Sequence, residues 1–172
     1  MEIKIEKTKT PKAKPVDETK LGFGHIFTDH MFVMEYDTGK GWHDARIVPY
    51  GDISISPAAM VLHYGQEIFE GMKAYRTPDG SIQFFRPEEN FKRMNISAER
   101  LVIPQLNVDD CLQALHELVK IDADWVPHTD GASLYSAQYN PRGTMNTLPQ
   151  DTSANTCFTR TSSRSRSKAL FI

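Results

Sequence analysis

Arg93 is the residue in this chain best suited to bind an anion. A guanidinium group presents a planar fork of N–H donors that matches the oxygens of a phosphate. Arg93 follows Lys92 in a segment predicted to be helical, and this context alone favours an exposed arginine on a charged helix face. The same reasoning assigns Glu67 and Glu70, which are predicted at helical spacing, to a solvated face.

Three histidines and two cysteines are the remaining candidates for metal binding or nucleophilic chemistry. His25, His30 and His63 lack the spacing of metal ligands, so we interpret them as structural. Cys111 and Cys157 form no metal or redox motif, and Cys111 falls in a helical pattern at a position expected in the core. The sequence therefore predicts no metal site.

A predicted hairpin precedes the helix that carries Arg93. Residues 72–75 and 82–85 are expected to form two strands, and the turn between them contains Pro78 and Gly80. Proline fixes φ near the start of a turn and glycine allows a positive φ at its end, as hairpin connections require. Pro87 then suits the first position of a helix, and the acids after it complement the positive helix end. This helix is predicted to run from residue 87 to about residue 100.

Further elements are predicted on both sides of this hairpin. Residues 108–122 give the clearest amphipathic helix, which Asn107 or Asp109 can cap. The other predicted elements are a strand over 25–36 with a bend at 28–30, a strand over 42–49, a short helix from Ser56 and Pro57 to Leu62, and a strand that begins at 132–135. The predicted fold class is α+β, with mainly antiparallel strands and about three helices.

Length and composition are those of a soluble globular protein. The chain has 172 residues, of which 40% are hydrophobic and 24% charged, and its net charge is -2. This charge gives no reason to expect nucleic acid as a partner. No run of 18 apolar residues occurs, so no membrane span is expected, and the N-terminus lacks the apolar stretch of a secretory signal. We therefore expect a cytoplasmic protein.

The chain divides into three predicted regions. Residues 1–20 are rich in Lys, Thr and Pro, and they predict a mobile arm or an edge strand at 3–5. Residues 21–135 carry the strand and helix patterns of a folded domain. From Ser136 onward apolar periodicity is lost and Ser and Thr dominate. Because residues 136–172 cannot bury enough apolar surface to offset the entropy of ordering, we predict that this tail is disordered.

Three segments of the chain resemble the branched-chain amino-acid aminotransferases, a family within the fold-type IV pyridoxal phosphate enzymes. They are GFGHIFTDHMF, YGQEIFEGMKAYR and FFRPEENFKRM. The resemblance covers about residues 21–135 and implies the small N-terminal α+β domain of that fold. D-amino-acid aminotransferase and aminodeoxychorismate lyase are lesser alternatives, and the first two segments favour the branched-chain group. A fold on its own would not decide between these activities.

The resemblance implies transfer of an amino group from Leu, Ile or Val to 2-oxoglutarate, with pyridoxal 5'-phosphate as cofactor and a homodimer as the assembly. It places Arg93 at the phosphate of the cofactor. It also makes Phe23, Tyr64, Phe69 and Tyr135 the walls of an apolar substrate pocket, which would recognise its ligand by burying methyl groups. From the residue types alone, ordinary core packing explains these four aromatic residues equally well.

The Schiff-base lysine of the family has no counterpart in this chain. Lys73 lies in a matching segment, but the family's lysine lies further along, in a second domain. Lys168 is the one lysine after Tyr135, and its segment matches nothing in the family. Because transamination passes through a covalent lysine adduct, we predict no catalytic residue and no activity. Two interpretations remain: an aminotransferase-family polypeptide, and a non-catalytic folded fragment or dimerisation module.

The resemblance ends inside a predicted strand. After Tyr135 the family continues with an apolar residue, an arginine and a proline, where this chain has Ser136, Ala137 and Gln138. A shifted reading frame followed by an early stop would produce so abrupt a change, and a natural disordered tail is the alternative.

Overall fold

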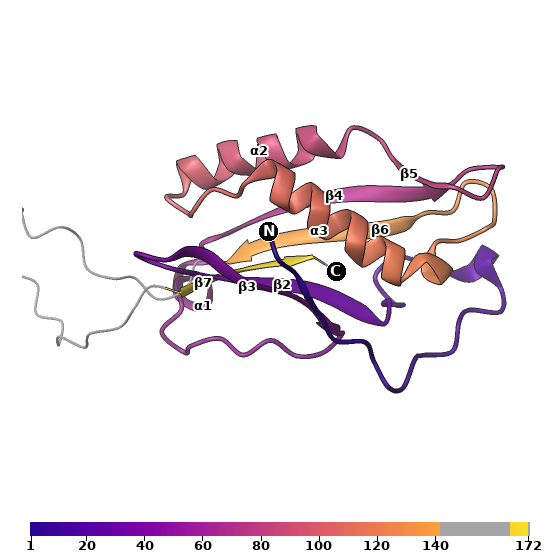
Figure 1. Cartoon of the computed structure of the whole chain (residues 1–172), viewed down its shortest axis with the longest axis horizontal. Helices are drawn as coiled ribbons and strands as arrows, with labels where there is room; N and C mark the ends of the chain where they lie inside the picture. Colours follow the sequence, from indigo (N-terminus) through magenta and orange to yellow (C-terminus); the bar gives the residue numbers. More distant parts are fainter. Residues whose placement is uncertain (142–165, 172) are drawn as a thin grey trace, which may run out of the picture.

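In the part of the chain that the structure describes, seven strands form one sheet, and the two long helices cover the same face of it (Figure 1). The structure is a computed structural model that describes residues 1–141 and, for the backbone alone, residues 166–171. The strand order is β1-β3-β2-β7-β6-β4-β5, in which β1 is parallel to β3 and every other neighbouring pair is antiparallel. The strands are β1 Lys4–Ile5, β2 His30–Asp37, β3 Gly41–Pro49, β4 Glu67–Arg76, β5 Ile82–Phe84, β6 Leu134–Pro141 and β7 Arg166–Phe171.

The described part of the chain contains three α-helices and two short 3-10 turns. The helices are α1 Met60–Tyr64, α2 Pro87–Arg100 and α3 Val108–Ile121, and the turns are η1 Glu18–Lys20 and η2 Ala123–Trp125. The predicted α+β class with mainly antiparallel strands and three helices is confirmed.

Local sequence signals explain where the two long helices begin. Pro87 occupies the first turn of α2, where its missing N–H costs nothing, and two acids follow it. Asn107 caps α3 because its side chain accepts a hydrogen bond from the backbone N–H of Asp110 at 3.0 Å. The two helices place their apolar faces on the sheet (Figure 1).

The main core lies between this sheet face and α2 and α3. Phe32, Phe91, Met94 and Leu115 are among its completely buried side chains. Cys111 is buried in the same core, as predicted, and burial raises the pKa of its thiol to about 12. A thiol held in this way is an apolar packing group rather than a nucleophile.

The predicted hairpin is present, but its first strand starts earlier than expected. The backbone N–H of Thr77 donates to the carbonyl of Ser81, and Gly80 has a φ of 85°. Strand β4 runs from Glu67, so Glu67 and Glu70 lie on a strand. The helical spacing predicted for these two acids is therefore wrong.

Two other predicted elements begin later in the structure. Strand β2 starts at His30 rather than at residue 25, because the carbonyls of Phe27 and Thr28 accept hydrogen bonds from the Lys12 ammonium instead of from a neighbouring strand. Helix α1 starts at Met60: the hydroxyl of Ser56 accepts from the N–H of Ala58 and closes a turn before the helix.

Strand β6 extends past the position where the tail was predicted to begin. It pairs with β4 from the Ala74–Leu134 pair to the Glu67–Pro141 pair. The backbone of β7 pairs with β2 and β6. The prediction of disorder is therefore corrected for 136–141 and 166–171, because strand pairing uses backbone groups that every composition supplies. Residues 142–165 and 172, also predicted to be disordered, lie outside the described residues.

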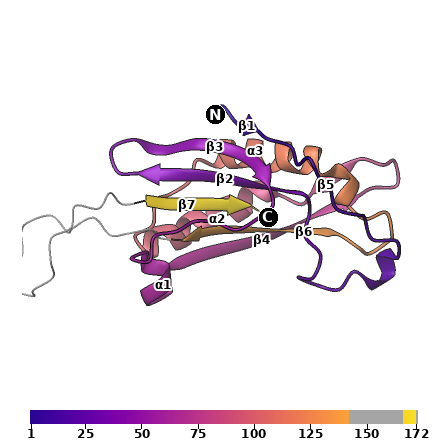
Figure 2. The same cartoon turned by 90° about the horizontal axis from the view of Figure 1, so that it is seen from below.

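The N-terminal arm crosses one end of the sheet (Figure 2). Of the two alternatives predicted for it, the edge strand is confirmed: β1 pairs with Arg46 and Ile47 of β3. The N-terminal ammonium also donates to the side chain of Asp110 at 2.8 Å. The arm is thus attached at its start and returns along the loop before β2.

Candidate functional site

A cavity of about 310 Å³ lies on the sheet face that α2 and α3 leave uncovered. Side chains alternate along β6. Tyr135, Ala137 and Tyr139 point toward this face, and Ser136, Gln138 and Asn140 are buried on the helix side. The cavity is lined by the arm (Lys14, Pro15, Glu18), the loop before β2 (Leu21, Gly22, Phe23, Gly24, Ile26, Phe27, Thr28), the segment after α3 (Asp124, Trp125, Pro127) and β6 with the residue before it (Ser133, Leu134, Tyr135, Ala137, Tyr139).

Two of the four aromatic residues predicted to form a substrate pocket meet in this cavity. The rings of Phe23 and Tyr135 pack edge to face with centroids 5.1 Å apart and an interplanar angle of 66°. Phe23 is 73% exposed, so the ring edge that does not contact Tyr135 is open to solvent. This pair forms an apolar wall of the cavity.

Gly71 provides the space in which the Tyr135 side chain lies. This contact was not predicted from the sequence. A Cβ added at Gly71 would lie 1.9 Å from the Tyr135 hydroxyl oxygen and 2.5 Å from the adjacent ring carbon. The ring therefore rests directly on the backbone of β4. The signal in the sequence is a glycine inside a strand, which often marks a close approach of this kind.

Tyr64 and Phe69, the other two predicted pocket residues, do not line the cavity. Tyr64 lies on α1 and is 77% exposed, and Phe69 lies on β4 and is 68% exposed. Phe69 is the cross-strand partner of Tyr139, so it shares the open sheet face with the cavity. Neither residue is packed in the core, so the interpretation of these two as ordinary core residues is wrong.

Arg93 is engaged by Glu70 rather than directed into the cavity. Its Nε donates to Glu70 Oε1 at 2.6 Å, and its Nη2 donates to Oε2 at 2.8 Å. Asn90 adds a third hydrogen bond to Oε2 at 3.1 Å. The hydrogen bonds and the charge of Glu70 raise the pKa of Arg93 further. Glu70 is mostly buried against α2, so its predicted place on a solvated face is wrong, whereas Glu67 is exposed.

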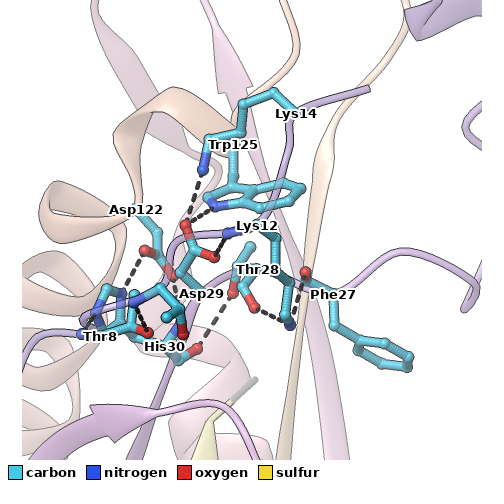
Figure 3. Close-up of polar contacts among 10 residues, drawn as sticks. Thr8, Lys12, Lys14, Phe27, Thr28, Asp29, His30, Asp122 and Trp125 are labelled. Atoms are coloured by element: carbon cyan, nitrogen blue, oxygen red, sulfur yellow. Dashed lines mark hydrogen bonds and ion pairs between the residues drawn. The ribbon is translucent and has the colours of Figure 1, made fainter. Parts of the chain in front are cut away.

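A second polar cluster joins the arm to the cavity wall (Figure 3). Asp29 Oδ1 accepts from the backbone N–H of Lys12 at 2.8 Å. Asp29 Oδ2 accepts from Lys14 Nζ at 2.8 Å and from Trp125 Nε1 at 2.9 Å. Burial would raise the pKa of Asp29, but these hydrogen bonds and the charge of Lys14 lower it to about 2. Asp29 is therefore an ionised anchor at neutral pH.

His30 lies beside this anchor and holds the arm at a second point. Its Nε2 accepts from the backbone N–H of Thr8 at 2.9 Å, and its Nδ1 lies 2.7 Å from Asp122 Oδ1. Because a backbone N–H can only donate, Nε2 carries no proton and the ring proton sits on Nδ1, where it donates to Asp122. Asp122 also accepts from the backbone N–H of His30 at 3.0 Å. The structural interpretation of His30 is confirmed.

Residues 1–141 contain no group of three or more His, Cys, Asp or Glu side chains placed to hold a metal ion. Among the helices that the structure describes, none is long and apolar enough to cross a membrane.

The described residues do not fit pyridoxal phosphate as a complete site. Glu70 neutralises Arg93 and occupies two of its N–H donors, and a carboxylate beside a phosphate is repulsive. Lys14 is the lysine that lines the cavity, but its ammonium is held by Asp29 and lies 3.8 Å from the centroid of the Trp125 ring. A lysine that forms a Schiff base must place its amine on the carbonyl carbon of the cofactor, and these two contacts hold the Lys14 ammonium elsewhere.

Comparison with solved structures defines the fold as that of the fold-type IV aminotransferases. The branched-chain amino acid aminotransferase of Escherichia coli aligns with a TM-score of 0.52 over 80% of this chain and 38% of that chain, at 18% identity. The enzyme of Thermobaculum terrenum, solved in its pyridoxal phosphate form, gives 0.51 over 81% and 38%.

Sequence comparison with curated proteins finds relatives among the branched-chain amino-acid aminotransferases. Branched-chain-amino-acid aminotransferase 2 of Bacillus subtilis is 53% identical over 133 residues, which are 77% of this chain and 36% of that protein. A probable branched-chain-amino-acid aminotransferase of Staphylococcus aureus gives the same identity over 77% and 37%, and the cytosolic enzyme of Caenorhabditis elegans is 44% identical over 78% and 32%. No family model matches the chain.

The chain is thus a homologue of the branched-chain amino-acid aminotransferases, as the three sequence segments predicted. It spans roughly a third of the length of the curated relatives that it matches.

Proposed function

We propose that this chain supplies part of the substrate-binding surface of a branched-chain aminotransferase, and that its cavity receives the aliphatic side chain of the amino acid or 2-oxo acid. The observation that carries the proposal is the apolar wall formed by Phe23 and Tyr135. Small-molecule sites are typically concave, mostly apolar and upwards of about 300 Å³. Each methylene that a ligand buries there would contribute about 0.8 kcal/mol.

The polar groups of the cavity support recognition through the apolar end of the ligand. Lys14 is paired with Asp29, and Glu18 Oε2 accepts from the backbone N–H groups of His128 and Thr129 at 2.8 and 2.9 Å. Lys14 and Glu18, two of the three charged residues that line the cavity with Asp124, therefore have partners within the protein. A branched aliphatic group can bury itself without breaking these contacts, whereas a charged group would have to compete with them.

Transfer of the amino group to 2-oxoglutarate, with pyridoxal phosphate as cofactor, is the activity we propose for the complete family enzyme. We assign no catalytic residue to the described part of this chain. Arg93 keeps its proposed role at the phosphate only where Glu70 releases it or shares it. For this enzyme we propose a cytoplasmic location and a homodimeric assembly, which the resemblance implies.

A non-catalytic folded fragment or dimerisation module is the second candidate function. The observation that favours it is the set of large exposed aromatic side chains on the described surface, which includes Tyr64, Phe69 and Phe85. Exposed apolar groups of this size are typical of surfaces that pack against another protein. Light scattering across a concentration series tests the dimerisation module, since such a module requires a defined oligomer in the absence of any ligand.

Ligand titration tests the binding proposal directly. We expect 4-methyl-2-oxopentanoate to shift the NMR signals of Phe23, Tyr135 and Ala137, and we expect Gly71→Ala to weaken its binding at least tenfold, because the new Cβ overlaps the Tyr135 ring. Gly51→Ala is the matched control: a Cβ there meets no atom within 4 Å. Equal affinity of the Gly71→Ala and Gly51→Ala variants, or shifts confined to residues outside the cavity, would refute the assignment.

A further inference from the structure

We propose that the N-terminal arm is a movable wall of the cavity and that the contact of Lys14 with Asp29 and Trp125 is the latch that holds this wall closed. The inference rests on the proposed function for the identity of the ligand, but not for the movement itself. It concerns how the ligand reaches the cavity, a step for which the sequence comparison assigns no residue.

The arm belongs to the cavity as well as to the edge of the sheet. Lys14, Pro15 and Glu18 all line the cavity, as residues of β6 do. Lys14 places its ammonium 3.8 Å from the centroid of the Trp125 ring, and Trp125 lines the same cavity. The wall on this side therefore consists of arm residues laid across Trp125, as Figure 3 shows for Lys14.

Firm attachments flank the latch on both sides. Upstream, the backbone of Glu6 donates to Ile47 of β3 at 2.9 Å, and that of Thr8 donates to His30. Downstream, Glu18 accepts from His128 and Thr129. Because both ends of the segment are attached, the residues between them can move away from the cavity while the arm stays bound to the domain.

The segment between these ends is held by contacts of Lys12 and Lys14, and the Lys12 ammonium also lies 4.5 Å from the centroid of the Tyr50 ring. Residues 9–14 are exposed. Lys12 and Lys14 bind Asp29, and the ammonium of Lys12 also donates to the carbonyls of Phe27 and Thr28 at 3.3 and 2.8 Å. A segment with few buried apolar contacts opens at a lower free energy than the core. Release of Lys14 uncovers Trp125, while the backbone N–H of Lys12 still donates to Asp29 and keeps the arm attached upstream of the latch.

Quenching of Trp125 fluorescence by acrylamide measures this opening without any ligand. The chain has two tryptophans, so the experiment uses a Trp42→Phe background in which Trp125 is the only reporter. We expect Lys14→Met to raise the quenching constant several-fold, because Trp125 is buried while the latch is closed. Lys14→Arg, which keeps the charge, should stay close to the parent protein.

Lys20→Met is the matched control, since Lys20 is another arm lysine that pairs with Asp17 and does not line the cavity. Equal quenching of the Lys14→Met and Lys20→Met variants would overturn the latch. Lys14 is 38% exposed, so we expect its replacement to leave the fold intact. Should the Lys14→Met variant unfold, amide exchange of the unmodified chain decides instead: the latch requires the Lys12 amide to exchange through local opening well before Leu115, and equal protection of the two overturns it.

The rates of ligand binding then connect the latch with the proposed function. In stopped-flow mixing with 4-methyl-2-oxopentanoate, a gate predicts that Lys14→Met raises both the association rate and the dissociation rate. A change in affinity alone would make Lys14 a static wall and overturn the gate. If no variant binds the acid, the proposed function fails, and the quenching and exchange results alone decide whether the arm opens.

Discussion

Gln138 allows a direct test of how β6 is held in the sheet. Its side chain is fully buried on the helix side of β6. The amide nitrogen donates to the hydroxyl of Ser136 at 2.7 Å, while the amide oxygen has no hydrogen-bond partner among the described residues. A buried carbonyl oxygen left without a donor costs about 1–3 kcal/mol. The buried Gln138 amide oxygen therefore lowers the free energy of unfolding, and an apolar residue of the same length at this position would avoid that loss.

The perturbation is a cycle of Ser136→Ala and Gln138→Met. Ser136→Ala alone leaves both ends of the buried amide unpaired, so we expect it to lower the free energy of unfolding by about 1–3 kcal/mol. Gln138→Met alone removes the unpaired oxygen but also the bond to Ser136, so its effect should lie between zero and a gain of about 1 kcal/mol. The double variant replaces both partners by apolar groups, and we expect it to be about 1–2 kcal/mol more stable than the parent chain.

Urea unfolding followed by circular dichroism measures the cycle. The midpoints should move and the slope of the transition should stay constant, because the surface exposed on unfolding hardly changes. Gln83→Met on β5 is the control, since Gln83 is exposed, and we expect a change within about 0.5 kcal/mol. A double variant that is less stable than the parent chain would refute the reasoning and place Gln138 in a different environment or register.

Three further outcomes are expected. The pKa of Asp29 is lowered to about 2 from an ordinary 3.8. Its contribution of about 2 kcal/mol to the free energy of unfolding is therefore present above pH 4 and is lost as the pH falls toward 2. Acid unfolding of the Asp29→Asn variant should lack this component. Glu70→Gln should lower the free energy of unfolding by about 0.5–1 kcal/mol by weakening the bond with Arg93, and in an Arg93→Met background the same substitution should no longer lower the stability measured in urea titrations. The chain mixed with pyridoxal phosphate, leucine and 2-oxoglutarate should form no glutamate above the rate of the free cofactor, and a borohydride-trapped lysine adduct would contradict this.

The elements that the sequence predicted well depend on neighbouring residues. The turn at Pro78 and Gly80, the cap at Asn107 and the apolar face of α3 all arise from residues a few positions apart. A backbone conformation or a helix cap is decided within such a distance. The sequence therefore predicted these elements close to their observed positions.

The features that the sequence did not predict depend on residues far apart in the chain. Tyr135 rests on Gly71, and Trp125 shares Asp29 with the arm. Neither pair produces a local pattern, because the strand order and the path of the arm bring the partners together. Composition was also a poor guide for residues 136–141, since strand β4 offers backbone partners along the full length of β6 whether or not its side chains suit a core.

The resemblance grouped Arg93 with four aromatic residues, and strand geometry explains why the structure separates them. Successive residues of a strand point to opposite faces. On β4, Glu70 faces the helices and captures Arg93 of α2, while Phe69 and Gly71 face the open side, where Tyr135 lies. The anion-binding group and the apolar wall therefore lie on opposite sides of one sheet. A ligand that used both would have to reach around the edge of β4, or Arg93 would have to leave Glu70. We therefore propose only the pocket for an aliphatic side chain for the described residues.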